Sequence, residues 1–424
     1  MKIVHICLSG LYMDGWGYQD NLLAKYHVLD GYDVTVIANE YMYDYEGNYV
    51  KIDGNKYCQP DIDCNGVKVV RLAAKGDKPV TGPAQRVHYI GLYDALVSVT
   101  PDIIFLHNPQ ILDVEDICKY MKDSDASARL DKMRGESNNV RLYVDSHSDY
   151  SNSARNFLSK HILHGILWRS KIQKLVPYTT KFYGVLPARV DFLLERYHTP
   201  KDKTELLVMG MDDELADKAR KSSVIEDIKN KLGIEDGDFV IISGGKIDHA
   251  KRQTLLLMDA VKNIDNPRLK LVVFGSVVED MRDEFIRKCD KVIDNLKTSD
   301  DLLLEEPDLT KRRVTYIGWL GADDTYPYFA ASSLAVFPGR HSVMWEQVAG
   351  QGIPMVVKYW DGTTHVDVGG NVKFLYEDSV AEIKRTIESL MDRSEDYETM
   401  KAVATDKASK EFSYRSIARK AIES

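Results

Sequence analysis

The chain has 424 residues, a length that predicts two or three domains at roughly 150 residues each. Its hydrophobic fraction of 44% is ordinary for a globular protein, and its net charge of −9 argues against general nucleic-acid binding, which needs a basic face. The five cysteines are widely spaced and indicate neither a disulfide framework nor a zinc site. Without a signal-peptide pattern or an apolar run of about 18 residues, a cytoplasmic protein is expected.

The first forty residues read as a strand, a loop, a helix and a second strand. The expected strands span Ile3–Leu8 and Val34–Ala38, and helical spacing runs from Tyr18 to Leu29. This βαβ opening predicts a parallel sheet. Further strands are expected at Val67–Leu72, Ile103–Leu106, Leu142–Val144 and Phe182–Val185, with helices near 84–99, 112–122 and 154–174. Residues 123–139 are polar and aperiodic, which indicates an exposed excursion.

The same pattern is then laid down a second time. Strands are expected at Phe239–Ser243, Leu269–Phe274, Val314–Ile317, Leu334–Phe337 and Pro354–Val357, with a helix at Gln253–Val261 after the first of them. We therefore predict an α/β fold with two Rossmann-like domains, 1–205 and 206–410. A helix at about 411–424 is expected to pack back on the first domain. In open parallel sheets, ligands bind at the carboxyl ends of the strands.

The loop after the first strand contains Gly15 and Gly17. With Asp20 in place of a third glycine, the loop is a poor match to a dinucleotide fingerprint. Glycines before a helix do let backbone amides approach a phosphate closely, so we predict that Gly15 and Gly17 contact one. A flexible loop with an ordinary turn is the alternative.

The most informative stretch follows the first strand of the second half. Gly244 and Gly245 leave the strand without side-chain bulk, and Lys246 and Lys251 stand five residues apart. Cations at a helix N-terminus are unfavourable for the helix dipole, so Lys251 and the neighbouring Arg252 suggest that an anion binds there. A diphosphate would supply that charge, whereas a solvated basic loop is the alternative.

A second motif surrounds Glu346, in an expected strand, turn and short helix. Its apolar neighbours Trp345 and Val348 predict a buried carboxylate, and a buried charge needs partners. Paired ribose hydroxyls would be suitable donors. Backbone amides or a nearby base would serve as well.

Two histidines end expected strands in the first half. His107 lies in His-Asn-Pro, and His147 lies in Asp-Ser-His-Ser-Asp. At the carboxyl ends of parallel strands, both are placed where a ligand binds. For each of them, a histidine hydrogen-bonded by the backbone is the competing interpretation.

Strand, Gly-Gly-Lys, four residues and Lys together resemble the donor-diphosphate loop of glycosyltransferase family 4, the retaining group with the GT-B fold, here of the bacterial surface-polysaccharide type. The resemblance implies two Rossmann-like domains whose parallel sheets face each other across a cleft. It also implies that Lys246, where the family usually has Arg, and Lys251 hold the diphosphate.

The resemblance extends to the other motifs. Glu346 matches the family's second Glu, which binds the nucleotide ribose, whereas Pro338 stands where the first Glu contacts the donor sugar. His341 and Ser342 are expected to occupy that space. His147 matches the position that faces the reactive sugar, and His107 matches a structural neighbour.

The implied function is transfer of a sugar from a UDP- or GDP-linked nucleotide sugar to an acceptor hydroxyl, with retention. The acceptor is expected to be a sugar or a lipid-linked glycan, and neither a cofactor nor a metal is expected. The D-x-D sequences at 61–63 and 123–125 are interpreted as surface loops. A sugar-nucleotide epimerase on the same fold and a catalytically silent scaffold are the alternatives.

Residues 155–189 form a basic segment without partners of opposite sign close in sequence, apart from Asp149 and Asp191 at its borders. Its cations are interleaved with apolar residues, a composition suited to anionic lipid headgroups. The segment therefore suggests peripheral attachment to the inner membrane face. A helix whose apolar stripe packs into the domain is the alternative.

Overall fold

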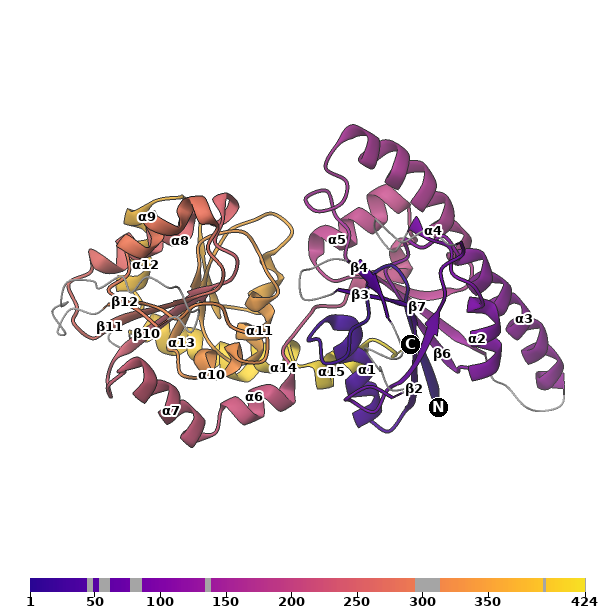
Figure 1. Cartoon of the computed structure of the whole chain (residues 1–424), viewed down its shortest axis with the longest axis horizontal. Coiled ribbons are helices and arrows are strands. Elements are labelled where there is room, and N and C mark those ends of the chain that lie inside the picture. Colours follow the sequence, from indigo (N-terminus) through magenta and orange to yellow (C-terminus); the bar gives the residue numbers. More distant parts are fainter. Residues whose placement is uncertain are drawn as a thin grey trace. The chain divides into compact units, whose positions relative to one another are not determined.

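The computed structural model describes residues 1–43, 49–52, 62–76, 86–133, 139–293, 313–391 and 394–423. The chain divides into two compact units, each with its own hydrophobic core (Figure 1). Unit 1 comprises Met1–Val208 and Tyr414–Ser424, and unit 2 comprises Met209–Ser413. Within the described residues, no helix is long and apolar enough to cross a membrane.

Unit 1 contains a seven-stranded parallel sheet with the order β5-β2-β1-β6-β7-β8-β9. Its strands are β1 (Lys2–Cys7), β2 (Asp33–Asn39), β5 (Lys68–Leu72), β6 (Ile103–His107), β7 (Arg141–Ser146), β8 (Thr179–Gly184) and β9 (Thr204–Leu206). A separate antiparallel pair joins β3 (Tyr41–Tyr43) and β4 (Tyr49–Lys51). The central strands are almost wholly buried, as expected where helices cover both faces of a parallel sheet.

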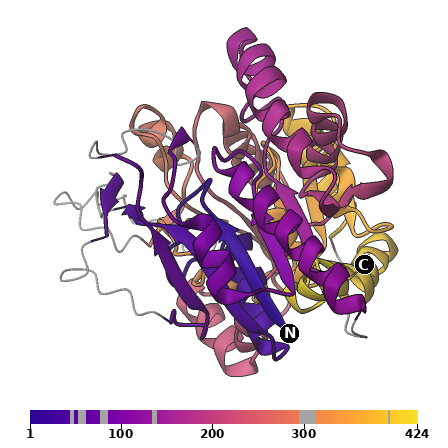
Figure 2. The same ribbon diagram turned by 90° about the vertical axis from the view of Figure 1, so that its right-hand side faces the viewer.

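The helices of unit 1 are α1 (Gln19–Leu29), α2 (Leu92–Val99), α3 (Val114–Met133), the π-helical η2 (Leu158–Trp168), α4 (Arg169–Leu175), α5 (Pro187–Phe192), η3 (Leu193–Tyr197), η4 (Lys201–Lys203) and α15 (Tyr414–Lys420). Helix α15, from the end of the chain, packs on α1. Figure 1 shows α1 and α15 on one side of the sheet and α2 and α3 on the other, and α2 and α3 lie in front of the sheet in Figure 2.

Unit 2 repeats this plan with the strand order β12-β13-β11-β10-β14-β15-β16, again all parallel. Its strands are β10 (Phe239–Gly244), β11 (Leu269–Phe274), β12 (Lys291–Val292), β13 (Val314–Tyr316), β14 (Leu334–Phe337), β15 (Met355–Lys358) and β16 (Val372–Leu375). Its helices are α6 (Asp213–Ala219), α7 (Ser222–Leu232), η5 (His249–Lys251), α8 (Gln253–Lys262), α9 (Glu279–Arg287), α10 (Thr325–Ala330), α11 (Met344–Gly350), η7 (Thr364–Val366), α12 (Val380–Glu388), α13 (Glu395–Val403), η8 (Ala404–Ala408) and α14 (Ser409–Glu411).

The predicted α/β architecture of two parallel sheets is confirmed. Locally, the helix expected near 84–99 begins only at Leu92, and strands β9, β12 and β16 were not expected. Residues 123–133, expected as an irregular excursion, continue helix α3 to Met133. The stretch from Asp123 to Met133 contains no glycine or proline, and Ala, Arg, Leu, Lys and Met favour helix. A helix with a polar surface keeps its backbone hydrogen bonds without an apolar period.

Each sheet has one point where the strand order reverses. In unit 1 it lies between β1 and β6, and in unit 2 between β10 and β14. In open α/β sheets the loops after two such strands diverge to opposite faces, and ligands bind at this carboxyl edge. The glycine and lysine loops therefore stand at the expected binding edge of their sheets.

Candidate functional site

The reversal point of unit 2 brings Gly245, Lys251 and Gly339 together. Gly245 follows β10 with φ +108, a conformation that favours glycine. A Cβ on Gly245 would stand 3.5 Å from the Lys251 Nζ, and one on Gly339 would stand 3.3 Å from the Lys251 Cγ. Gly339 thus makes room for the Lys251 side chain, whereas Gly245 makes room first for the Met344 side chain, whose Cε would stand 2.6 Å from the added Cβ, with the Lys251 Nζ beside it.

Lys251 is half-buried, and its ammonium has no hydrogen bond or ion pair within the described parts of the chain. Burial lowers its pKa, and the Asp248 carboxylate only partly opposes this. The next cation behaves differently, because Arg252 donates to Glu284 at 3.0 Å. Of the two cations expected at the helix start, only Lys251 is therefore available for an anion.

Lys246 lies in the same loop but is largely solvated. Its side chain is 68% exposed, and its Nζ stands 3.9 Å from the Asp248 Oδ2. Asp248 also begins the short η5 turn by accepting a hydrogen bond from the Ala250 amide at 3.0 Å. Lys246 thus lies at the carboxyl edge of the sheet, where its long and solvated side chain is free to turn toward a ligand.

Glu346 on α11 is fully buried, as its apolar neighbours predicted. Its Oε1 accepts from the Nε2 of His341 at 2.7 Å and of His365 at 2.8 Å. Burial alone would raise the pKa of this carboxyl, but the two histidines hold it well below its usual range. The Oε2 is buried without a hydrogen-bond partner in the described structure.

His365, from η7, was missed by sequence reasoning. Only the expectation that buried Glu346 requires a partner pointed to a further base, and nothing in the local pattern located it 19 residues downstream. His341 lies beside Glu346 as a direct partner, and Ser342 accepts the Trp345 amide at 3.0 Å where α11 begins. Within the described residues, the ligand atoms of His341, Glu346 and His365 also lie close enough, within 4.8 Å, to hold a metal ion.

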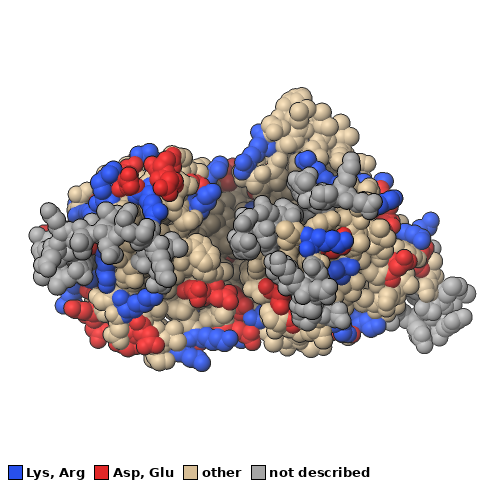
Figure 3. Space-filling view, in the orientation of Figure 1, with Lys and Arg blue, Asp and Glu red and all other residues tan. Residues whose placement is uncertain are grey.

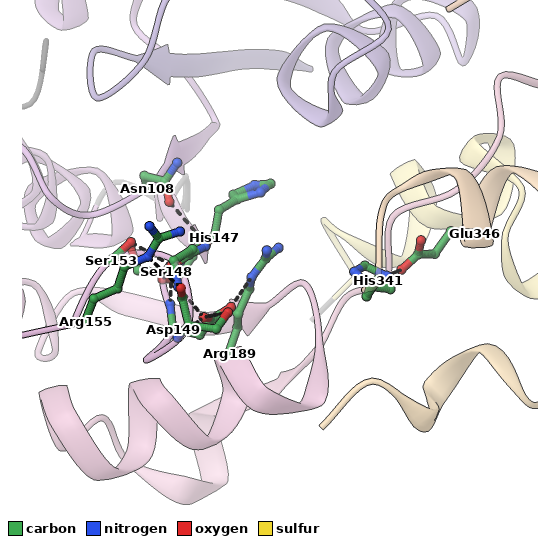
Figure 4. A network of polar contacts seen from close by, with 12 residues as sticks. Asn108, His147, Ser148, Asp149, Ser153, Arg155, Arg189, His341 and Glu346 are labelled. Carbon is green, nitrogen blue, oxygen red and sulfur yellow. Dashed lines mark hydrogen bonds and ion pairs between the residues drawn. The ribbon is translucent and has the colours of Figure 1, made fainter. Parts of the chain in front are cut away.

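In unit 1, His147 directly follows β7, and its side chain is 31% exposed. Its amide donates to the Asn108 Oδ1 at 2.8 Å, which ties it to the loop after β6. The fully buried carboxylate of Asp145, on β7, lies 3.7 Å from the His147 Nε2. Figure 4 shows the His147 ring projecting from this network.

The loop after His147 is held in place by Asp149, which is 6% exposed. One Asp149 oxygen accepts from the amides of Ser151 at 2.7 Å and Asn152 at 3.0 Å, and the other accepts from the Arg189 Nε at 3.2 Å (Figure 4). Asn152 also donates to the His147 carbonyl at 2.7 Å. His147 is therefore presented from a braced loop.

Gly15 and Gly17 lie in the loop between β1 and α1. Gly15 has φ +74, and a Cβ on either glycine would meet no atom within 4 Å. The space beside their backbone is open, as contact with a ligand would require. The loop also follows β1, at the reversal point of unit 1.

The expectation that both D-x-D sequences are surface loops was wrong in two respects. Asp63 lies in a loop, but it is buried and accepts from the Tyr12 hydroxyl at 2.6 Å, so it is not at the surface. Asp123 lies on helix α3 and accepts from the Tyr93 hydroxyl at 2.8 Å. Asp61 lies outside the described residues.

The basic segment 155–189 is less basic in the fold than in the sequence. Glu115 of α3 pairs with both Lys171 and Lys174, at 2.7 and 2.6 Å, and Lys181 pairs with Glu205. Trp168 of η2 is buried and Leu163 packs against the core, but five apolar residues of η2 and its start are exposed: Phe157 72%, Leu158 65%, Ile162 51%, Ile166 65% and Leu167 39%. We call these five residues the apolar face of η2.

The sequence matches no known family profile, and a comparison with curated proteins gives no significant match. Solved structures are similar over the whole chain. A glycosyltransferase from Rickettsia africae ESF-5 gives a TM-score of 0.61 at 11% identity, over 99% of this chain and 96% of that one. HepE from Anabaena, solved with UDP, gives 0.58 at 15% identity, over 99% and 98%.

A third similar structure has a different activity. The UDP-GlcNAc 2-epimerase from Neisseria meningitidis, bound to UDP-GlcNAc, gives a TM-score of 0.57 at 13% identity, over 99% of this chain and 98% of that one. At these identities the likeness establishes the fold, which is that of the GT-B glycosyltransferases and their structural relatives.

Proposed function

We propose that the protein is a retaining glycosyltransferase that moves a sugar from a UDP- or GDP-linked donor to an acceptor hydroxyl, in glycan or polysaccharide assembly. The observation that carries this proposal is the half-buried ammonium of Lys251 at the reversal point of the unit 2 sheet, which has no ion pair among the described residues. Burial disfavours this positive charge, so a bound anion would stabilise it, and a nucleoside diphosphate has a suitable charge and size.

In this mechanism Lys251, with Lys246 and nearby amides, stabilises the charge that develops on the leaving diphosphate. Gly339 and Gly245 leave room for the Lys251 side chain beside the loops that would hold the diphosphate. Glu346 would bind the ribose through Oε2, since His341 and His365 already occupy Oε1. No metal is required in this scheme, because the lysines supply the positive charge.

The first-half residues would serve the sugar and the acceptor. His147 would orient the reactive sugar, from the loop that Asp149 braces. Gly15 and Gly17 would offer backbone amides to donor or acceptor phosphate. Pro338 aligns with the family's first glutamate, and His341 and Ser342, if they occupy its space as the sequence predicts, would set the preference for the donor sugar.

Titration calorimetry with UDP and GDP, followed by transfer from the matching nucleotide sugars, tests the proposal. Loss of the Lys251 charge in Lys251→Ala should reduce kcat/KM by about 100-fold or more. Arg252→Ala is the matched control, because Arg252 is bound to Glu284 and should be dispensable. Equal activity of Lys251→Ala and the wild type would remove the basis of the proposal.

An epimerase is the second candidate, favoured by the similar Neisseria structure. It would use the same nucleotide site but would need no acceptor. Incubating the protein with UDP-GlcNAc alone separates the two: a new sugar epimer in the NMR spectrum supports an epimerase. A catalytically silent scaffold would bind nucleotide without slow donor hydrolysis, which a transferase is expected to show.

We also propose that the apolar face of η2 binds an anionic membrane, which would place the enzyme at the inner membrane face beside a lipid-linked acceptor. Five exposed apolar side chains lie here beside cations, including Lys160 and Arg169. Figure 3 shows a region largely free of charge at the top of unit 1, with blue at its border. The paired Lys171 and Lys174 contribute less than the sequence suggested.

Co-sedimentation with phosphatidylglycerol vesicles tests this attachment. Replacing Phe157, Ile162 and Ile166 together by Ser should reduce vesicle binding by at least about tenfold, because burying even one such side chain contributes about 1.5–3 kcal/mol. Ile90→Ser is the control, since Ile90 is 59% exposed elsewhere on unit 1. Equal binding of the triple variant and the control would exclude η2 as the contact.

A further inference from the structure

Three histidines form a buried hydrogen-bonded chain through unit 1. His27 on α1 lies with its Nε2 2.8 Å from the Ala418 carbonyl of α15 and its Nδ1 3.0 Å from the His5 Nε2. The His5 Nδ1 on β1 lies 2.9 Å from the His107 Nε2 on β6. The His107 Nδ1 lies 2.8 Å from the Asp145 Oδ2 on β7, and every side chain in the chain is at most 4% exposed.

The number of protons shared by the three histidines follows from the groups at the two ends of their hydrogen-bonded chain. The Ala418 carbonyl can only accept, and an ionised Asp145 can only accept. Four hydrogen bonds therefore need four protons, whereas three neutral imidazoles supply only three. One additional proton must reside either on an imidazole or on Asp145, or else one buried bond is lost.

The surroundings of Asp145 favour the carboxylate. Its Oδ1 accepts from the Asn108 amide at 3.0 Å, and the His147 Nε2 lies 3.7 Å from its Oδ2. Although burial opposes it, the charges and hydrogen bonds of His107 and His147 hold the pKa of Asp145 far below its usual range. The extra proton therefore belongs to an imidazole.

Among the three histidines, His107 is the one whose ring is hydrogen-bonded directly to a carboxylate. Burial opposes the charged form, but Asp145, and then Asp20, raise the pKa of His107. Burial lowers the pKa of His5 well below its usual range, and it lowers that of His27 to about 4 although Asp30 partly opposes this. The charged groups facing the chain thus locate the proton at its Asp145 end.

We propose that His5, His27 and His107 hold one proton more than three neutral imidazoles, on His107, and that the resulting buried ion pair with Asp145 positions the loops of Asn108 and His147. His107 is a positioning residue, because it acts through Asp145. Its proton cannot leave through the other end of the chain, where the Ala418 carbonyl is buried. The claim about the proton is independent of the proposed function, whereas a role for His147 in transfer rests on it.

Nitrogen-15 NMR of the full chain, labelled at histidine, tests the proton count. At pH 7.5 we expect one of these three rings to have both nitrogens protonated. Its signals should be assigned to His107 by their loss in His107→Gln. Two rings with one protonated and one bare nitrogen should be assigned to His5 and His27 by their own glutamine variants. A bare nitrogen on His107 at pH 7.5 overturns the proposal.

Asp145→Asn supplies a matched test, because asparagine has an acceptor and a donor where they are needed. Its Oδ1 can accept from the Asn108 amide while its Nδ2 donates to the His107 Nδ1, so four bonds then need no extra proton. We expect the doubly protonated signal to disappear while the other two rings remain neutral. Its persistence contradicts the proposal, and if the variant does not fold, the wild-type spectrum still decides.

A pH profile separates the ion pair from simple packing. A raised pKa in the folded state adds stability that is lost as pH rises through that pKa. As pH rises from about 6.5 through the raised pKa of His107, the wild-type Tm should therefore fall by more than the Tm of Asp145→Asn. Parallel pH profiles of the two proteins overturn the positioning role. The absence of any sugar transfer would refute the proposed function but leave the NMR result intact.

Discussion

Replacing Lys251 by methionine should change stability and nucleotide affinity in opposite directions. The half-buried ammonium has no hydrogen bond or ion pair among the described residues, and burial lowers its pKa. Methionine fills similar space between Gly245 and Gly339 without a charge to desolvate. We expect Lys251→Met to raise the free energy of unfolding by about 1 kcal/mol, the lower end of the cost of an unsatisfied buried polar group.

The same change should weaken nucleoside diphosphate binding. A hydrogen bond to a charged group contributes about 1.5–3 kcal/mol, so Kd should rise by roughly 10- to 150-fold. Urea unfolding measures the first effect, and titration calorimetry with UDP and GDP measures the second. Arg252→Met is the control: it breaks an exposed ion pair with Glu284, which is worth about 0–1 kcal/mol, and should leave affinity unchanged.

The combination of signs is the test. A Lys251→Met variant that loses more than about 1 kcal/mol of stability and binds nucleotide as tightly as the wild type would refute the reasoning. Lys251 would then be a structural residue whose aliphatic stem packs between the two loops, and the anion site would lie elsewhere.

Three further predictions concern the partners of Glu346, the loop at Gly245 and the buried His27. His365→Ala removes one of the two donors to the buried Glu346 Oε1 and should lower the free energy of unfolding by about 1–3 kcal/mol in urea titrations, whereas equal stability would mean that water replaces the imidazole. Gly245→Ala forces a side chain onto φ +108 and should lower the free energy of unfolding by more than about 1 kcal/mol in the same assay, whereas an unchanged free energy of unfolding would contradict the strained conformation. His27 is buried with a pKa of about 4, so the unfolded chain binds more protons below pH 6.5, and the stability contributed by neutral His27 falls as pH falls, by about 2 kcal/mol at pH 5. Urea unfolding at pH 7.5 and 5 should show this loss in the wild type and a smaller one in His27→Gln, and identical losses would contradict it.

The sequence predicted the longer strands of both sheets and the loops that follow them, because apolar runs and glycines are local signals, but it missed the short strands β9, β12 and β16. It also predicted that Glu346 is buried, from two neighbours on the same short helix. It did not predict His365 as a partner, because that contact is made by a separate turn and depends on tertiary placement. Whether Glu346 binds a ribose stays a prediction.

The charge patterns were the least informative part of the sequence. Lys171 and Lys174 read as free cations until helix α3 placed Glu115 against both. Arg252 read as a partner of Lys251, but Glu284 of α9 holds it. In each case an acid more than thirty residues away in the chain cancels a charge that local spacing leaves exposed.

The return of the chain to unit 1 has a consequence for biosynthesis. Helix α15 packs on α1, its Arg419 pairs with Asp30 at 2.7 Å, and the Tyr143 hydroxyl donates to the Ile422 carbonyl at 2.9 Å. Residues 209–413 form unit 2 from one continuous stretch. Unit 1, in contrast, lacks its helix α15 until the ribosome has passed residue 420. During translation, unit 1 is therefore begun first and completed last, and the α1 surface stays uncovered while unit 2 is being made.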